Sequence, residues 1–131
     1  MKLKYFLTAL LFTPTFAIAN AQLSCGALKE DSEGMSSSQT CTFRNGSINQ
    51  AFLAFGKKKE LWQPLIKSGL PAKNSKMKTR IKGLSSPVAI TVTWKGKNQV
   101  DVSACQDESD YCTEATFTQK ANNVIIKATH Y

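Results

Sequence analysis

Residues 88–104 alternate apolar and polar side chains with a period of two, and this pattern restricts that part of the chain to β structure. A loop at Gly96-Lys97-Asn98 divides the segment into two strands. A three-residue loop places Val92 opposite Val102, so that the apolar side chains share one face. A two-residue loop would place Val92 opposite Asp101 and mix the faces. The sequence therefore predicts an antiparallel hairpin with a three-residue loop.

The C-terminal residues predict a second hairpin by the same reasoning. A turn at Ala121-Asn122 places Phe117 opposite Ile126. The same register places Ala115 opposite Ala128, so all four side chains lie on one face. The pattern therefore favours a second antiparallel pair of strands.

A further turn is expected at Asn45-Gly46, because both central residues of a type I′ hairpin turn need positive φ. This turn follows the strand-like run 40–44. Residues 51–55 are apolar on both alternating faces, which is typical of a strand that is covered on two sides, and we expect a strand there. The alternative is a short helix that begins after a capping box at Ser47 and ends at Gly56.

The connection over 57–71 has roughly helical spacing of its apolar residues. Pro64 is compatible with the first position of a short helix and Gly69 with its end, whereas a long helix through Pro64 would be costly. We expect one or two helical turns. Trp62 is expected to anchor this connection to the sheet, because an indole buries a large apolar area.

Residues 1–21 are typical of a secretory signal peptide. Lys2 and Lys4 precede an apolar run over 5–12, and Ala19-Asn20-Ala21 provides the small residues that signal peptidase recognises. The apolar run is too short to span a bilayer, and no later segment approaches the roughly 20 apolar residues of a transmembrane helix. We expect a single secreted or periplasmic domain over 22–131.

Four cysteines remain in the exported domain, and an oxidising compartment favours their pairing. Three pairings are possible, and we expect sequence neighbours to pair: Cys25 with Cys41, and Cys105 with Cys112. With the strand patterns, this predicts a mainly β, disulfide-stapled fold. We expect a small antiparallel sandwich or open barrel of about six or seven strands, with at most one short helix.

Positive charge is concentrated in one segment of the chain. Nine basic residues lie from Lys57 to Lys82 against one acid, Glu60, whereas the formal net charge of the whole chain is +8. If 76–82 is a strand, its four basic side chains share a face at a spacing of about 6.6 Å. Lysines on an outer strand also prevent edge-to-edge aggregation, which is the alternative interpretation. The candidate binding residues are Lys57, Lys58, Lys59, Lys76, Lys78, Arg80 and Lys82.

No pattern in the sequence indicates catalysis, a metal or a cofactor. The one histidine, His130, is expected to face solvent at the end of a strand, and no Gly-x-Ser-x-Gly or Cys-x-x-Cys pattern occurs. The acidic run at 107–110 lacks the glycine and the last glutamate of an EF-hand loop. We therefore expect a protein that is not an enzyme and that uses neither metal nor cofactor.

The leading hypothesis is an exported, non-catalytic binding protein of the inhibitor, immunity or effector type. Its basic segment would engage an acidic protein surface. One alternative is binding of a polyanion, either nucleic acid or a cell-envelope polymer. Another is a surface-fibre subunit that donates a strand formed by 124–131.

Overall fold

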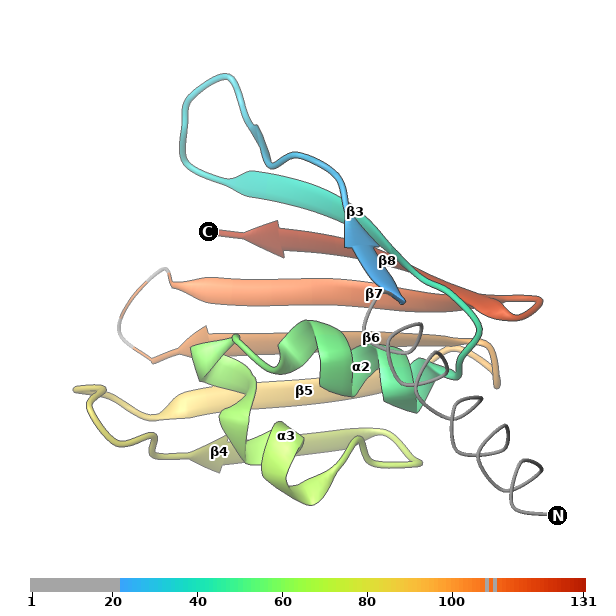
Figure 1. Cartoon of the computed structure of the whole chain (residues 1–131). Coiled ribbons are helices and arrows are strands. Elements are labelled where there is room, and N and C mark those ends of the chain that lie inside the picture. Colours follow the sequence, from blue (N-terminus) through green and yellow to red (C-terminus); the bar gives the residue numbers. More distant parts are fainter. Residues whose placement is uncertain (1–21, 108, 110) are drawn as a thin grey trace, which may run out of the picture.

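One antiparallel sheet and one layer of short helices form the protein (Figure 1). The computed structural model describes residues 22–107, 109 and 111–131, and within these residues the sheet has eight strands. The predicted signal peptide lies outside the described residues. The mainly β, antiparallel and disulfide-stapled fold is confirmed. Helices take the place of the second sheet, and two short strands from the N-terminal segment raise the strand number.

The sheet is open, with an edge on either side. Its order is β1-β3-β8-β7-β6-β5-β4, and β2 also pairs with β3. The strands are β1 (Leu23–Cys25), β2 (Lys29–Glu30), β3 (Ser37–Phe43), β4 (Ser75–Thr79), β5 (Val88–Trp94), β6 (Gln99–Gln106), β7 (Cys112–Lys120) and β8 (Asn123–His130). The helices are α2 (Ile48–Gly56), α3 (Gln63–Ser68) and the 3-10 turn η1 (Glu60–Trp62).

Both hairpins that the alternation predicts are present. Val92 of β5 lies opposite Val102 of β6, as the three-residue loop requires. Phe117 of β7 lies opposite Ile126 of β8, and Ala115 lies opposite Ala128. In each strand from β5 to β8, three alternate residues are buried against the helices and those between them stay at least partly exposed.

The strand predicted for 51–55 is wrong, and the helical alternative is correct. Ser47 caps α2: its hydroxyl accepts from the Gln50 amide at 3.3 Å, and Gln50 Oε1 accepts from the Ser47 amide at 2.9 Å. An apolar run that fits a doubly covered strand also fits a helix, and here Ala51, Phe52 and Phe55 fall on one helical face and are buried. The structure thus has two short α-helices, α2 and α3, and the 3-10 turn η1, where at most one short helix was expected.

Asn45-Gly46 turns the chain from β3 into α2 and does not form a hairpin. Asn45 has φ of 54°, in the left-handed region that the turn requires, and the Gly46 amide donates to the Asn122 carbonyl at 2.9 Å. A Cβ at Gly46 would overlap the Phe43 ring and lie 2.9 Å from Gln50 Oε1. Glycine is therefore required by close packing.

The core lies between the helices and the sheet. Trp62 is fully buried and stacks on Phe52 with 5.4 Å between ring centroids, and Phe52 also meets Phe117 of β7 at 5.8 Å. Trp62 thus anchors the connection after α2 to the sheet, as its size predicts.

Both disulfides join residues that lie directly opposite each other on neighbouring strands. Cys25 of β1 is bonded to Cys41 of β3, and Cys105 of β6 is bonded to Cys112 of β7. The predicted pairing of sequence neighbours is confirmed. The first bond attaches the edge strand β1, and the second closes the connection between β6 and β7.

We predict that Gly46→Ala destabilises the domain by about 1–3 kcal/mol, because the added methyl group overpacks the Phe43 ring. Gly26→Ala is the matched control, since a Cβ there makes only an ordinary contact of 3.5 Å with the Thr40 carbonyl. Urea unfolding of the oxidised proteins measures both. Equal midpoints for the two variants would contradict this account of the turn.

Candidate binding surface

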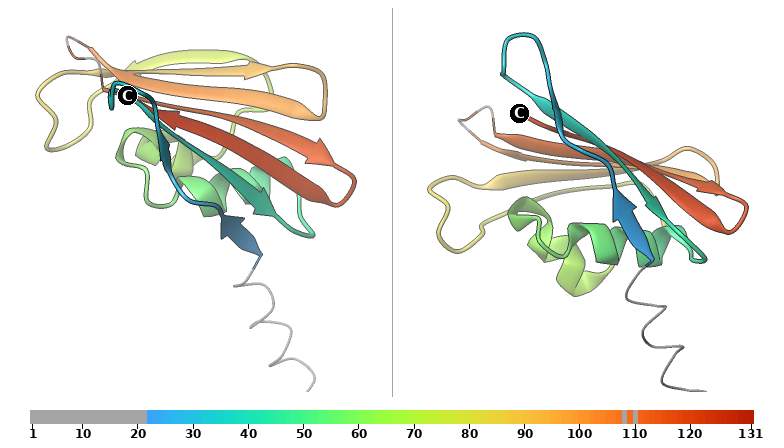
Figure 2. Two further views of the ribbon diagram at one scale, coloured as in Figure 1. Left: turned by 90° about the horizontal axis from the view of Figure 1, so that it is seen from above. Right: turned by 45° about the horizontal axis from the view of Figure 1, so that its top comes forward.

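One face of the sheet carries the helices, and the other has no covering layer in the part of the chain that the structure describes (Figure 2). We call the second surface the open face. Its side chains are those between the buried residues of each strand, and the strand register extends the same face to β3 and β4. The open face is therefore the surface of the sheet that remains accessible to a partner.

The open face is polar and rich in hydroxyl groups. No aromatic side chain lies among its strand residues, and Ile125 is its one large aliphatic side chain in the described strands. The hydroxyl residues are Ser24, Ser38, Thr40, Thr42, Thr91, Thr93, Ser103, Thr116, Thr118 and Thr129. The charged strand residues are Lys29, Lys76, Lys78, Asp101, Glu114, Lys120 and Lys127. This composition supports polar and ionic recognition, and the strand residues themselves provide no aromatic ring on which a sugar or base could stack.

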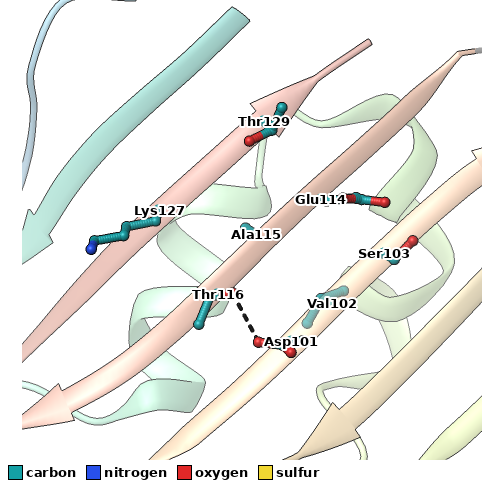
Figure 3. A pocket seen from close by; sticks show the side chains of 8 residues that line it. All are labelled: Asp101, Val102, Ser103, Glu114, Ala115, Thr116, Lys127 and Thr129. Atoms are coloured by element: carbon teal, nitrogen blue, oxygen red, sulfur yellow. Dashed lines mark hydrogen bonds between the residues drawn. The ribbon is translucent and has the colours of Figure 1, made fainter. Parts of the chain in front are cut away.

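A shallow hollow of about 310 Å³ lies at the centre of the open face, between β6, β7 and β8 (Figure 3). Asp101 is already satisfied there: one carboxylate oxygen accepts from Thr116 Oγ1 at 2.8 Å, and the other lies 3.2 Å from Lys95 Nζ. Glu114 and Lys127 are exposed at the same hollow. The centre of the face therefore presents both signs of charge.

The edge strand β4 brings two predicted residues onto the open face. Lys76 lies opposite Thr91 and Lys78 lies opposite Ala89, both on the face away from the helices. Lys78 Nζ is 2.8 Å from Asp107 Oδ2, and the lysine side chain remains 63% exposed. Lys76 is exposed and has no ion pair among the described residues. We call Lys76 and Lys78 the basic edge.

Arg80 and Lys82 do not extend this row, because β4 ends at Thr79. A turn follows, in which the Leu84 amide donates to the Ile81 carbonyl at 3.1 Å and Gly83 has φ of 93°. Both basic side chains are exposed in this connection to β5. The predicted spacing of four charges along one strand therefore holds only for the first two.

Lys57, Lys58 and Lys59 belong to the other layer of the molecule. They follow α2, on the helix-covered side, at the end of the sheet where the connection from β4 to β5 also lies (Figure 1). Lys57 and Lys58 are exposed, and Lys59 is half-buried. The predicted basic segment is thus divided between two layers, and only its second part reaches the open face.

His130 was expected to face solvent, but it turns toward the helix layer. Lys59 Nζ lies 3.2 Å from His130 Nε2, and His130 Nδ1 lies 3.3 Å from Thr113 Oγ1, whose residue is buried. An ammonium group only donates, so Nε2 must accept and the imidazole proton lies on Nδ1, from which it is donated to Thr113. The signal was present in the sequence, because His130 continues the period of Ile126 and Ala128.

The surroundings of this cluster lower the pKa of both basic groups. Burial lowers the pKa of Lys59 below 10.5, and Lys59 Nζ also lies 4.9 Å from the centroid of the Phe55 ring. Burial first, and then the positive charge of Lys59, lower the pKa of His130 below 6.5. At neutral pH the imidazole is therefore uncharged.

An apolar hollow lies at one corner of the open face. It has a volume of about 450 Å³ and is lined by Met35, Ser109, Cys112, Glu114 and Tyr131. Met35 is 71% exposed and Tyr131 is 53% exposed. The corner therefore presents apolar area beside an otherwise polar face.

The described residues contain no group of three or more histidine, cysteine or acidic side chains that could hold a metal ion. Among the same residues, none of the helices has the length and apolar character needed to cross a membrane.

Comparisons with known proteins give no family for this chain. No protein-family model matches the sequence. No curated protein matches it either. Among solved structures, CalU16 from Micromonospora echinospora aligns with a TM-score of 0.38 and 9% identity, covering 82% of this chain and 68% of CalU16.

We predict that the imidazole of His130 titrates below 6.5 and that Lys59→Met raises its midpoint, because the neighbouring positive charge is removed. NMR titration of the ring carbons measures this, with the exposed Lys57→Met as the control that leaves the midpoint in place. The unfolded chain binds a proton at higher pH than the folded one, so His130 makes the free energy of unfolding fall as pH drops from 6.5 toward its folded pKa. A midpoint at or above 6.5 in the unchanged protein would contradict this environment.

Proposed function

We propose that this chain is an exported, non-catalytic binding protein that engages an acidic protein surface through the open face and the basic edge. The observation that carries the proposal is the uncovered polar face, where Asp101 and Asp107 already have lysine partners. Lys76 and Lys127 stay exposed there, together with the exposed acid Glu114. Complementary charges of this kind accelerate association and select the partner. Two disulfides are consistent with an oxidising compartment, which supports a secreted or periplasmic location.

A protein partner fits the surface better than a polyanion. Lys127 shares the central hollow with Asp101 and Glu114, so the face carries both signs of charge. Proteins that bind single-stranded nucleic acid combine a basic groove with stacked aromatic rings, and the strand residues of the open face have no ring. Met35 and Tyr131 add exposed apolar area at the corner, and Met and Tyr are enriched in protein interfaces.

Strand donation from the C-terminus is a poor fit to this architecture. β8 lies inside the sheet, where it pairs with β3 on one side and with β7 on the other. Donation of β8 to another subunit would break its hydrogen-bond ladders with both β3 and β7. The binding proposal needs no such rearrangement, because the open face is already accessible.

We predict that the oxidised domain over 22–131 binds immobilised poly-L-glutamate at low salt and that Lys76→Glu/Lys78→Glu weakens this binding by about an order of magnitude. Each exposed charge pair contributes at most roughly 1 kcal/mol, and the double variant reverses two of them. Lys57→Glu/Lys58→Glu is the matched control, because it changes the net charge equally on the helix-covered side. Circular dichroism checks that both variants fold.

Three results would count against the proposal. An equal loss of binding in the two double variants would mean that binding to immobilised poly-L-glutamate depends on net charge alone. Retention that does not depend on salt would exclude an ionic surface. Much stronger retention on heparin than on poly-L-glutamate at the same salt concentration, also lost in Lys76→Glu/Lys78→Glu, would favour the polyanion alternative.

A further inference from the structure

The backbone of β4 has one side bonded to β5 and one side free. In the part of the chain that the structure describes, β4 ends the strand order and no other strand pairs with it. Such an edge presents unpaired amide and carbonyl groups to any extended chain that approaches it. Which residues present these groups follows from the hydrogen-bond pattern of the neighbouring hairpin.

The Lys95 amide donates to the Gln99 carbonyl at 2.9 Å, so this pair closes the β5–β6 hairpin as a hydrogen-bonded pair. Hydrogen-bonded and non-hydrogen-bonded pairs alternate along an antiparallel ladder. The odd-numbered residues of β5 therefore bond to β6, and the even-numbered ones point their backbone groups toward β4. The Trp94 amide confirms this direction, because it donates to Asn74 Oδ1, just before β4, at 2.7 Å.

The even-numbered residues of β5 lie opposite Ser75, Met77 and Thr79 of β4. Those three residues are the ones that bond to β5. The amide and carbonyl groups of Lys76 and Lys78 then point away from the sheet, to the free edge. The same two residues carry their side chains on the open face, so the free edge presents main-chain hydrogen-bonding groups and positive charge at the same positions.

We propose that an extended acidic segment of a partner protein adds to this free edge as a further strand. Acidic side chains at positions i and i+2 of that segment lie opposite Lys76 and Lys78, and the residue between them lies beside Met77, which is 38% exposed. This inference rests on the proposed function and names the partner class and the docking mode. Main-chain bonds supply affinity in such strand addition, and the alternate side chains supply specificity.

The charge of the edge decides between an acidic segment and a second copy of this chain. Two β4 edges that paired with each other would place lysines opposite lysines, and like charges directly opposite each other are destabilising. The same lysines attract a strand with acids at every second position. Edge protection and partner selection are therefore two effects of the same two side chains.

Hydrogen exchange with a model peptide tests the proposal. The probe is a capped peptide of alternating glutamate and valine, at millimolar concentration and low salt, with amide exchange read by NMR. In the free domain we expect fast exchange at Lys76 and Lys78 and protection at Met77. Addition of the peptide should slow exchange at Lys76 and Lys78 and leave Met77 unchanged. Protection of Lys76 and Lys78 in the free domain, or fast exchange in the presence of bound peptide, would overturn the proposal.

Two matched comparisons separate strand addition from simple charge attraction. The first peptide control carries the same residues with the glutamates in one block, and the second carries N-methyl groups on the amides that would face β4. On the protein side, Lys76→Pro removes the outward amide together with the charge, whereas Lys76→Gln removes the charge alone. Proline is tolerated on an edge strand where its nitrogen faces solvent.

Strand addition predicts that the alternating peptide binds more tightly than either control, and that Lys76→Pro binds more weakly than Lys76→Gln. Equal binding of all three peptides, lost at high salt, would overturn strand addition and leave the charged binding surface standing. If neither the peptides nor poly-L-glutamate bind, the proposed function itself fails. Should Lys76→Pro not fold, the N-methyl peptide gives the same discrimination on the unchanged protein.

Discussion

The packing of Phe52 and Trp62 against Phe117 holds the two layers of this protein together. Phe52 comes from α2, Trp62 ends η1, and Phe117 comes from the middle of β7, so three elements meet in one set of ring contacts at 5.4–6.0 Å. Phe55 joins the same contacts from the next turn of α2. Large aromatic side chains dominate core energetics in small domains. These rings therefore fix the helix layer on one face of the sheet.

The position of the helix layer also determines the candidate binding surface. One helix layer covers one face of a sheet, and the alternation of β5–β8 assigns apolar residues to that face and polar residues to the other. The polar half remains accessible because no second layer is present among the described residues. The disulfide between Cys105 and Cys112 links β6 and β7 at the end of this open face. The core packing and the accessible polar face are thus consequences of the same pattern.

Local sequence patterns were sufficient to predict the pairing of strands that follow each other closely in the sequence. The register of β5 with β6 follows from loop length and alternation, which is why the pairing of Val92 with Val102 could be predicted. The run 51–55 was misassigned because its apolar residues satisfy both a doubly covered strand and a helix, and the choice depends on burial against Trp62 and Phe117. Propensity alone does not supply that long-range contact.

The candidate site, like the fold, could be predicted from the sequence only in part. The sequence placed Lys76 and Lys78 on one face of a strand, and the structure agrees. The end of β4 at Thr79 and the position of Lys57–Lys59 on the helix side depend on the tertiary arrangement and could not be read from spacing. The contact of Lys59 with His130 joins residues 71 positions apart, although the inward direction of His130 follows from the period of β8.

The most direct measurement is the accessibility of threonine methyl groups to a soluble paramagnetic agent, read by NMR relaxation. Thr113 faces the helices and is 3% exposed, whereas Thr91, Thr116 and Thr129 lie on the open face. The account predicts strong relaxation enhancement for these three methyl groups and little for Thr113. Protection of all four methyl groups to the same extent would mean that the second face is covered in solution, and it would contradict the central claim that one face of this sheet is left for a partner.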